Sequence, residues 1–397
     1  MEKIWVNLSD VLFFQEGPGV RNTQYTLEGV KLLNVANLVD GNIDLSTSER
    51  YISNEEAYGK YKHFLCDAGD FIVASSGIKV EYVDKKMGFV DESMLPLCMN
   101  TSTIRFKVID SDKLNIRYFM YYLKSHHFKE QLSKHITGSA QLNYGPSHLK
   151  KMSIPLLELK VQNVLIEKLD KVQAIIDLRR KEIQELDNLI KARFVEMFGD
   201  AVNNDRSWDV GTIDSVCDAI YGGGTPSKSH PEYYDNGNIP WVTSKDMKSD
   251  TISGSQIYIN ELGVSNSSAK LVPINSIIMV IRSGILKHSL PVAINLVPVT
   301  VNQDLKVFVT GEKIIPRFLV VLFKMLEKDI LTGVRAVTAD NIEFDTLKKR
   351  EIILPPLELQ KQFADIVEQI DKSKVVVQKA LDEAQTLFDS LMQEYFG

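Results

Sequence analysis

The chain has 397 residues, a length that predicts two or more domains, and its content of 44% hydrophobic and 25% charged residues is typical of a globular protein. No apolar run reaches the ~18–20 residues of a membrane span, and the N-terminus lacks a signal-peptide pattern, so we expect a cytoplasmic protein. The net charge of −6 argues against a strongly basic, free-standing nucleic-acid-binding protein, and three scattered cysteines indicate neither a disulfide framework nor a zinc site.

The first segment, residues 1–155, mixes strand-like and helix-like patterns. Residues 69–77 (GDFIVASSG) predict a buried strand that runs into a turn of small residues. A β-branched run at 102–109 is followed by a helix-like stretch at 117–125. The segment is close to neutral, so it can still hold a local basic face. We predict an α+β domain here.

A long amphipathic helix is predicted next, within residues 156–200. It follows the phrase IPLLELKVQ at 154–162 and closes on EMFG at 196–199. Its apolar residues recur at alternating steps of three and four, which is the spacing of a coiled-coil seam, and Arg179 and Arg193 occupy two of the steps. The predicted seam comprises Leu165, Leu169, Val172, Ile176, Ile183, Leu186, Ile190 and Met197.

Residues 201–355 repeat the plan of the first segment. NSIIMVIRSG at 275–284 resembles the strand and turn of 69–77, and LKVFVT at 305–310 resembles the earlier β-branched run. A helix-like stretch follows at 317–326. This segment is also nearly neutral. The sequence therefore predicts a second α+β domain of the same kind.

A second long helix is predicted within residues 356–397. Its opening phrase, LPPLELQKQ at 354–362, matches IPLLELKVQ at a separation of 200 residues, so that Gln362 corresponds to Gln162. It ends on EYFG, as the first helix ends on EMFG, and it reads as slightly shorter than the first. Its predicted seam comprises Phe363, Ile366, Ile370, Val377, Leu387 and Leu391, with Ser373, Ala380 and Ala384 at the remaining steps.

The two phrases read as helix starts. Proline is tolerated in the first turn of a helix, where its missing N–H has no partner, so Pro155 and Pro355 suit that place. Glu158 and Glu358 suit it too, because the helix dipole favours negative charge in the first turn. Gly199 and Gly397 then suit a helix stop.

The two helices are predicted to pair with each other as an antiparallel coiled coil. The chain would then be a dumbbell with a pseudo-two-fold axis, and a helix of ~35 residues would set its two domains roughly 50 Å apart. Such a pair of domains suits a target with two half-sites, of which DNA is the obvious example. The alternative is that each amphipathic helix packs on its own separate core.

Catalytic patterns are nearly absent from the sequence. GGGTPSKS at 222–229 lacks the spacing of a phosphate-binding loop, and no Gly-x-Gly-x-x-Gly follows a strand. The only proline pair lacks the Asn/Asp-Pro-Pro-aromatic form that holds an extruded adenine in methyltransferases. The seven histidines form no metal-binding pattern. We expect a chain that does no chemistry itself and binds no cofactor or metal.

Two stretches resemble a known family. AIYGGGTPSKSHPEYYDNGNIPWVTSKDM at 219–247 is similar to the opening of a target-recognition domain in the specificity subunits of type I restriction-modification systems. LPPLELQKQFADIVEQID at 354–371 is similar to the conserved helix of that family. The resemblance implies two target-recognition domains, 1–155 and 201–355, separated by two conserved helices. The first half lacks Thr-Pro-Ser and Ile-Pro-Trp, as divergent half-sites would require.

The resemblance also implies partners. A specificity subunit would read a bipartite double-stranded DNA target and bind two adenine methyltransferase (modification) subunits. ATP-dependent restriction subunits would complete the enzyme. S-adenosylmethionine, ATP and Mg would reside on those partners and not on this chain.

Side chains that match base edges or phosphates mark the candidate DNA contacts. In the second domain the candidates lie in the glycine-rich turn, in the polar turn that follows Ile-Pro-Trp-Val, and in the turn that ends the predicted buried strand. In the first domain they lie in the turn after the predicted buried strand, in a lysine pair and in an amide-rich loop. The candidates are Thr225, Ser227, Lys228, Thr243, Ser244, Lys245, Arg282 and Ser283 in the second domain, and Ser75, Ser76, Lys79, Lys85, Lys86, Gln141, Asn143 and Tyr144 in the first. A structural turn or ordinary surface charge is the alternative for each.

Helix positions off the predicted seams are the candidates for binding the methyltransferase partners. They are Ile175, Arg179, Arg180, Leu189, Phe194 and Phe388, and the alternative is packing against the chain's own domains. Two other functions remain open at this point. The chain could be a structural adaptor that spaces two proteins and ignores DNA, or it could hold a concealed methyltransferase or nuclease site.

Overall fold

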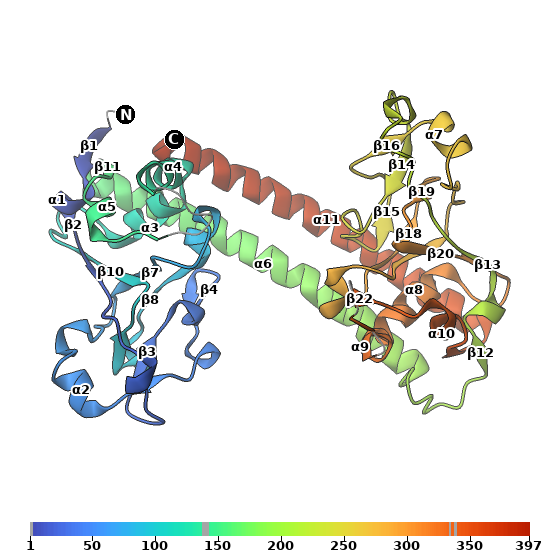
Figure 1. Ribbon diagram of the computed structural model, residues 1–397, viewed down its shortest axis with the longest axis horizontal. Coiled ribbons are helices and arrows are strands. Elements are labelled where there is room, and N and C mark those ends of the chain that lie inside the picture. Colours follow the sequence, from blue (N-terminus) through green and yellow to red (C-terminus); the bar gives the residue numbers. More distant parts are fainter. Residues whose placement is uncertain (1–2, 137–142, 333–334, 337–339) are drawn as a thin grey trace. The chain divides into compact units, whose positions relative to one another are not determined.

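The computed structural model describes residues 3–136, 143–332, 335–336 and 340–397. Its contacts divide the chain into two compact units. Unit 1 contains Met1–Leu178 and Ala380–Gly397, and unit 2 contains Arg179–Lys379. Each unit therefore includes one globular segment, the beginning of one long helix and the end of the other (Figure 1).

The globular segment of unit 1 is α+β, as predicted. Its elements are β1 (Ile4–Asn7), α1 (Leu8–Val11), β2 (Leu12–Glu16), β3 (Val30–Leu33), β4 (Leu38–Val39), β5 (Asn42–Ile43), β6 (Tyr51–Ile52), α2 (Asn54–Tyr58), β7 (Phe71–Ala74), β8 (Met87–Phe89), β9 (Leu97–Met99), β10 (Thr103–Val108), α3 (Ile116–Lys124), α4 (His126–His135), α5 (Pro146–Leu149) and β11 (Ser153–Leu156). The antiparallel sheet β2-β10-β7-β8 holds the predicted buried strand, β7, and the predicted β-branched run, β10. In the smaller sheet β6-β3-β9, strands β3 and β9 are parallel.

The globular segment of unit 2 repeats this organisation. Its elements are β12 (Val210–Thr212), β13 (Cys217–Gly222), β14 (Ile239–Val242), β15 (Thr251–Ile252), β16 (Tyr258–Ile259), α7 (Glu261–Ser265), β17 (Ile277–Val280), β18 (Val292–Asn295), β19 (Thr300–Val301), β20 (Leu305–Thr310), α8 (Pro316–Met325), α9 (Glu327–Thr332), β21 (Arg335–Ala336), β22 (Asp340–Asn341), α10 (Phe344–Lys348) and β23 (Glu351–Ile353). The predicted buried strand is β17 and the predicted run is β20, in the sheet β13-β20-β17-β18-β15. The smaller sheet β16-β14-β19 again contains one parallel pair, β14 and β19.

Aromatic side chains fill the space between sheet and helix in both segments. In unit 1, Phe106 of β10 lies 4.9 Å from Phe119 of α3, measured between ring centroids. In unit 2, Phe308 of β20 lies 5.5 Å from Phe323 of α8. All four rings are buried, so each covering helix is fixed to its sheet by apolar contact.

The two long helices have equal lengths. Helix α6 spans Leu159–Phe198 and helix α11 spans Leu357–Phe396, and each contains 40 residues. The prediction of a shorter second helix is therefore wrong. Gly199 follows α6 with a positive φ of 75°, the left-handed conformation that commonly ends a helix.

The start of one helix and the end of the other share a core in each unit. In unit 1, the ring of Phe396 at the end of α11 lies 5.1 Å from Tyr118, in the same cluster as Leu165 of α6. In unit 2, Phe198 at the end of α6 lies 5.4 Å from Phe363 near the start of α11. Within each unit the helices are therefore antiparallel neighbours, which is the pairing expected from the seams.

The sequence-based register of the repeat is wrong by two residues. The helices start at residues 159 and 357, which are 198 positions apart, whereas the matching phrases are 200 apart. Pro155 consequently lies inside strand β11, and Pro355 lies just before α11, so neither occupies a first helical turn. Residues that are identical in the two aligned phrases therefore do not occupy equivalent positions in the structure.

Part of the predicted seam on α11 is also displaced. Leu387 was expected to face the partner helix, but its side chain is 52% exposed. Phe388, which was expected off the seam, is 8% exposed and lies 6.2 Å from Tyr121 in unit 1. The buried stripe continues through Met392 and Phe396, because the large aromatic side chains enter the globular core beyond the helix pair.

Among the described helices, none is long and apolar enough to cross a membrane. The three cysteines, Cys66, Cys98 and Cys217, all lie in described segments and are free thiols. Burial raises the pKa of each thiol to about 12, so all three are protonated at neutral pH.

Candidate nucleic-acid interface

The parallel strand pair of unit 2 ends in a tightly bonded loop. We call its residues Asn302, Gln303 and Asp304 the hub loop of unit 2. The backbone N–H of Asn302 donates to the carbonyl of Val242, at the end of β14, over 3.0 Å. The Asn302 side chain is 9% exposed, and its amide donates to Oδ2 of Asp304 over 3.1 Å. The loop therefore has a fixed shape.

The hub loop brings together the three segments of unit 2 in which DNA contacts were predicted. The Thr225 hydroxyl donates to the Gln303 side chain. The Asp304 carboxylate pairs with Arg282, and its carbonyl accepts the N–H of Ile281 over 2.9 Å. Val242, whose carbonyl accepts the N–H of Asn302, immediately precedes the segment of Thr243, Ser244 and Lys245. Residues scattered over 80 positions of sequence thus lie around one loop.

The turn that contains Thr225 depends on glycine. A Cβ on Gly223 would lie 1.8 Å from the carbonyl oxygen of Val301, so the strand and the turn can approach only without a side chain there. Trp241 is 5% exposed and donates from Nε1 to the carbonyl of Gly224 over 3.0 Å. Trp241 is therefore a core residue that supports the turn.

The predicted residues of this turn face solvent. Thr225, Ser227 and Lys228 are all exposed. The hydroxyl of Ser227 lies 2.7 Å from that of Ser229, which stabilises the turn without burying either group. These side chains are accessible to a ligand.

The segment after β14 combines a structural residue with an exposed one. Thr243 donates its N–H and its hydroxyl to Oδ2 of Asp246, over 2.8 and 2.9 Å, and thereby closes a turn. Ser244 is half-buried, and Lys245 is exposed. Lys245 also lines a hollow of about 350 Å³ together with Lys248 and Gln256. Of the three predicted residues here, Lys245 is the most accessible.

The third segment carries the ion pair of Arg282. Its Nε lies 2.6 Å and its Nη2 2.5 Å from Oδ1 of Asp304, and its side chain remains 49% exposed. The Ser283 hydroxyl accepts the N–H of Ile285 over 3.4 Å and begins a short 3-10 turn. Arg282 also forms an isolated bridge with Asn341, which is exposed.

Unit 1 contains the same framework with other side chains. The hub loop of unit 1 comprises Asn100, Thr101 and Ser102, and the N–H of Asn100 donates to the carbonyl of Leu33 over 3.1 Å. The Ser102 carbonyl accepts the N–H of Ser75 over 2.8 Å, as Asp304 accepts that of Ile281. An isolated bridge joins Ser76 to Asn143, in the place of the bridge between Arg282 and Asn341. By these bonds Ser76 is the counterpart of Arg282.

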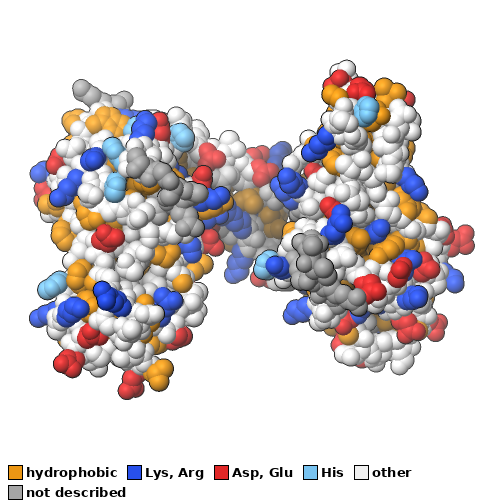
Figure 2. All heavy atoms as spheres, viewed as in Figure 1, with side chains coloured by type: hydrophobic (Ala, Val, Ile, Leu, Met, Phe, Trp, Pro, Cys, Tyr) orange, Lys and Arg blue, Asp and Glu red, His pale blue; other side chains and the backbone are white. Residues whose placement is uncertain are grey.

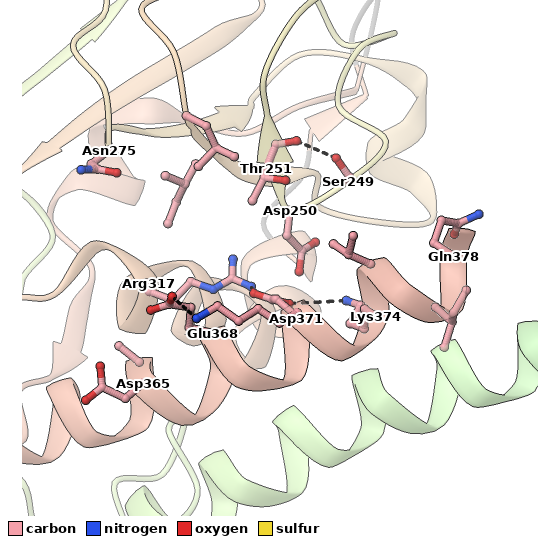
Figure 3. Close-up of a pocket in the computed structure, with 16 residues that line it drawn as sticks. Ser249, Asp250, Thr251, Asn275, Arg317, Asp365, Glu368, Asp371, Lys374 and Gln378 are labelled. Atoms are coloured by element: carbon pink, nitrogen blue, oxygen red, sulfur yellow. Dashed lines mark hydrogen bonds and ion pairs between the residues drawn. The ribbon is translucent and has the colours of Figure 1, made fainter. Parts of the chain in front are cut away.

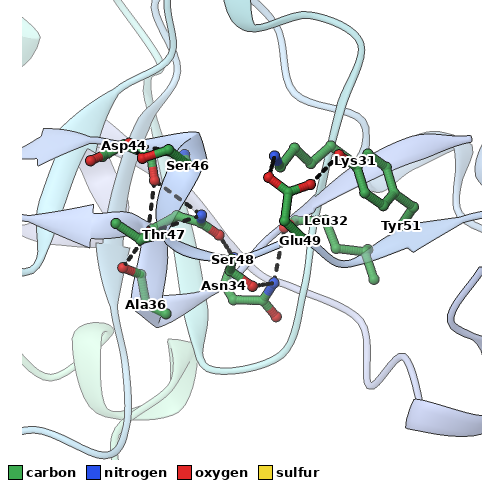
Figure 4. Close-up of polar contacts among 11 residues, drawn as sticks. Lys31, Leu32, Asn34, Ala36, Asp44, Ser46, Thr47, Ser48, Glu49 and Tyr51 are labelled. Carbon is green, nitrogen blue, oxygen red and sulfur yellow. Dashed lines mark hydrogen bonds and ion pairs between the residues drawn. The ribbon is translucent and has the colours of Figure 1, made fainter. Parts of the chain in front are cut away.

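A second network of polar side chains, centred on Asn34 after strand β3, fixes the hub loop of unit 1. The amide of Asn100 donates to Oδ1 of Asn34 over 2.8 Å. Asn34 is itself held by hydrogen bonds. Its backbone N–H donates to the Asn37 side chain. Its side-chain amide donates to the carbonyl of Leu32 and to the hydroxyl of Ser48 (Figure 4). The turn from Asn34 to Asn37 corresponds to that from Thr243 to Asp246 in unit 2.

Two predicted DNA contacts of unit 1 are corrected by their burial. Tyr144 is 2% exposed, and its hydroxyl donates to the carbonyl of Ala74 over 3.0 Å. Burial raises the pKa of this tyrosine, which keeps it neutral. Ser75 is 1% exposed, with a buried hydroxyl. The Tyr144 hydroxyl supports the turn from within, and neither side chain offers a surface to DNA.

The other predicted residues of unit 1 differ in accessibility. Lys79 and Asn143 are exposed, and Ser76 is half-buried. Lys85 is exposed and lies over the Tyr82 ring at 5.7 Å, while Lys86 donates to the carbonyl of Leu38 over 2.7 Å and is half-buried. Gln141 lies outside the described residues. Figure 2 shows basic and acidic side chains interspersed on the visible face of each unit.

Sequence reasoning missed the residues that organise both hubs, namely Asn100, Asn302, Gln303 and Asp304. A signal was present, because an asparagine stands shortly before each β-branched run, in MNTST and in VNQDL. Aligning the two runs would have placed Asn100 opposite Asn302. The role of Asp304 had no such signal, because Ser102 stands in its place.

Among the candidate partner positions, two on α6 are apolar and exposed. Ile175 is 46% exposed and Leu189 is 42% exposed. Arg179 pairs with Glu182 over 2.6 Å along the same helix, and Arg180 is exposed to solvent. These four positions are accessible to a partner.

The two phenylalanines of that group are corrected. Phe194 is fully buried in unit 2, with its ring 5.7 Å from Phe318, and Phe388 is buried in unit 1. The alternative of packing against the chain's own domains holds for both. Their aromatic character at the end of a helix gave no sign of which face would enter the core.

Unit 2 also holds a cavity of about 600 Å³ between α11 and residues 249–251 (Figure 3). Charged side chains from both sides line it, and some of them form ion pairs. Arg317 pairs with Asp371, and Asp250 pairs with Lys324. Burial raises the pKa of Asp371. Burial acts in the same direction on Asp250, but Lys324, Lys374 and Arg317 together outweigh it and lower the pKa of that carboxyl. The pair of Arg317 and Asp371 joins α8 to α11, and the pair of Asp250 and Lys324 joins α8 to the segment before β15.

The sequence matches the family described as type I restriction modification DNA specificity domain over residues 27–188 and 205–384. A specificity subunit of a type I restriction enzyme from Escherichia coli is 31% identical over 237 residues, which are 56% of this chain and 56% of that protein. Another from Methanocaldococcus jannaschii is 22% identical over 324 residues, 77% of this chain and 73% of that one. The match to the Escherichia coli subunit thus spans about half of its length.

Two solved structures share the fold. One is the S subunit of a type I restriction-modification system from M. genitalium, with a TM-score of 0.54, 15% identity and coverage of 100% of this chain and 96% of that one. The other, from work on complex assembly and conformational transition of the type I R-M system, has a TM-score of 0.53, 16% identity and coverage of 99% and 97%. Since the two matched ranges cover most of the sequence and include both hub loops, the chain belongs to the type I restriction-modification DNA specificity family.

Proposed function

We propose that this chain is the non-catalytic, DNA-targeting subunit of a cytoplasmic type I restriction-modification complex. It reads a bipartite double-stranded target, with one recognition domain (1–155 or 201–355) on each half-site. The observation that carries the proposal is the repeated hub loop. The same backbone hydrogen bonds recur in both units, while the exposed side chains around them differ. A common frame with different reading groups suits two different half-sites.

Two adenine methyltransferase subunits and the ATP-dependent restriction subunits complete the complex. S-adenosylmethionine, ATP and Mg reside on those partners, and this chain recognises the DNA sequence at which they act. Because the chain is an internal repeat, it offers each methyltransferase subunit an equivalent surface. A residue that binds this partner should then be apolar and exposed at both equivalent positions, 198 residues apart.

Two pairs of helix residues meet this requirement. Leu189 and Leu387 are 42% and 52% exposed, and Leu178 and Val376 are 59% and 68% exposed. Other exposed apolar residues of α6 have polar counterparts: Val164 corresponds to Gln362, Val195 to Gln393 and Ile175 to Ser373. The two matched pairs are therefore our candidate contacts for the methyltransferase subunits, ahead of Ile175, Arg179 and Arg180.

Methylome sequencing of cells that carry this chain with its methyltransferase subunits tests the function. We expect a split motif with a nonspecific spacer, in which exchange of residues 1–155 or 201–355 for those of a relative changes one half-site only. Methylation without sequence preference would favour a structural adaptor instead. Methyl transfer or DNA cleavage by the purified chain alone would contradict a non-catalytic role.

A further inference from the structure

Three side chains of unit 2 form a hydrogen-bonded series that ends at the surface. The buried amide of Asn302 holds Oδ2 of Asp304 at 3.1 Å. Oδ1 of Asp304 accepts from Nε and Nη2 of Arg282 at 2.6 and 2.5 Å. The Arg282 side chain is nevertheless 49% exposed, so the series presents a fixed guanidinium group to solvent.

The orientation of this pair determines what Arg282 can still bind. A guanidinium has five N–H donors in one plane, and Asp304 accepts from the side formed by Nε and Nη2. The end formed by Nη1 and Nη2 points away from that carboxylate and carries two parallel N–H groups. Two parallel donors match two acceptors that lie side by side, and in duplex DNA the O6 and N7 atoms of guanine form such a pair in the major groove.

We infer that Arg282 reads a guanine in the half-site of unit 2 and that Asp304 is its positioning residue. This inference rests on the proposed function and adds the base and the two side chains. A phosphate contact needs only a cation, and it gains nothing from a carboxylate that lowers the net charge of the pair. A base contact needs a fixed plane, which the carboxylate provides because Asn302 holds it in turn.

The counterpart positions in unit 1 differ in the required way. Ser76 stands in the place of Arg282, and Ser102 stands in the place of Asp304, by the backbone bonds described above. Neither serine provides a planar pair of donors. The contact should therefore affect one half-site only, and the half-site read by unit 1 is an internal control within every experiment.

The test uses the complex of the full chain with its methyltransferase subunits. Binding is measured on duplexes in which each position of the mapped target is substituted in turn. In the wild type, replacing one guanine of the unit 2 half-site should weaken binding by about 10-fold or more. The Arg282→Ala variant should lose discrimination at that position alone. Arg282→Lys keeps the charge but lacks the planar pair of donors, so it should reduce discrimination at that guanine, while its binding to the duplex that lacks the guanine stays close to that of the wild type.

The Asp304→Asn variant tests positioning. It should reduce discrimination at that guanine and leave preferences at all other positions unchanged, which a general loss of folding would not do. Lys245→Ala, at another candidate DNA contact near the same hub, should leave the discrimination at that guanine intact even if it weakens binding to all duplexes equally. Equal weakening on all duplexes by Arg282→Ala, with full rescue by Arg282→Lys, would identify a phosphate contact and overturn the inference. Unchanged preferences in Arg282→Ala would overturn it as well. A wild-type complex without any preferred sequence would contradict the proposed function itself.

Discussion

Gln360 makes the same hydrogen bonds in unit 2 that Gln162 makes in unit 1. Both side chains are fully buried near the start of a long helix. Each amide donates to a carbonyl before its own helix and to a lysine carbonyl in the loop before α8 or α3, and each carbonyl oxygen accepts a backbone N–H from that loop. The partners are Pro355, Lys313 and Ile315 for Gln360, and Leu157, Lys113 and Asn115 for Gln162.

Replacement of Gln360 by alanine should therefore destabilise unit 2. The change leaves two carbonyls and one N–H without their partner, and we expect a loss of about 2–3 kcal/mol in the free energy of unfolding. Urea denaturation of the chain measures the loss. Gln362→Ala is the matched control, because Gln362 is exposed and is the residue that the sequence phrases pair with Gln162. An equal cost for both variants would contradict the 198-residue register.

The same glutamines show how far the sequence predicts the fold. Periodicity and apolar runs located both helices and the strands β7, β10, β17 and β20, and the matching phrases revealed the internal repeat. Identity of letters then misaligned Gln162 with Gln362. The residue type does not show whether a side chain is buried. Gln360 and Gln362 lie on the same helix, but only Gln360 faces the loop that supplies its hydrogen-bond partners. That loop is distant in sequence, so its position had to come from the folded unit.

The candidate DNA interface was also predicted only in part from the sequence. Turn chemistry marked the segments of Thr225, Lys245 and Arg282, and the structure brings these segments together. Tyr144 was misassigned, because an aromatic residue in an amide-rich loop reads alike whether it faces DNA or a carbonyl such as that of Ala74. Asp304 was missed, because a lone carboxylate becomes informative only beside the arginine it orients.

Substitution of Leu189 or Leu387 by aspartate should remove one methyltransferase subunit from the complex. Both side chains are exposed, so a charge should not unfold the chain, but it would be buried without a partner in an interface. Each single variant should bind one methyltransferase subunit and the double variant none, as measured by native mass spectrometry.

Matched controls exist on the same helix. Val164 and Val195 are each 47% exposed, and their equivalents are glutamines. Val164→Asp and Val195→Asp should retain both methyltransferase subunits. If they lose a subunit as readily as Leu189→Asp does, the matched pairs are not the contact surface.

The ion pair of Asp250 and Lys324 should make part of the stability of unit 2 depend on pH. Burial raises the pKa of the Asp250 carboxyl, but Lys324, with Lys374 and Arg317, outweighs burial and holds this pKa below its usual 3.8. A lowered pKa in the folded state means that the contribution is present above pH 3.8 and is lost as the pH falls through the lower folded value. Asp250→Asn should therefore destabilise the chain by about 1–3 kcal/mol at pH 7 and by less in strong acid.

Urea denaturation at several pH values measures this difference. Asp345→Asn is a suitable control, because Asp345 also pairs with a lysine, Lys348, but its side chain is 77% exposed. An exposed pair of this kind contributes little to stability. A cost for Asp250→Asn that is the same at pH 7 and below pH 3 would show that the lost interaction is not the charge.

Lengthening both long helices should change the spacer of the DNA target and not its half-sites. Seven residues added to α6 between Leu178 and Arg179, and seven added to α11 between Lys379 and Ala380, keep the 3.5-residue seam in phase and lengthen each helix by about 10 Å. At about 3.4 Å per base pair, the spacer should grow by about three base pairs. Methylome sequencing reads the spacer and both half-sites in one experiment. A seven-residue insertion in the loop at 200–209, between Asn203 and Asn204, should leave the motif unchanged, because that loop lies outside both helices. An unaltered spacer in the lengthened chain would mean that the helices do not set the separation of the two recognition domains.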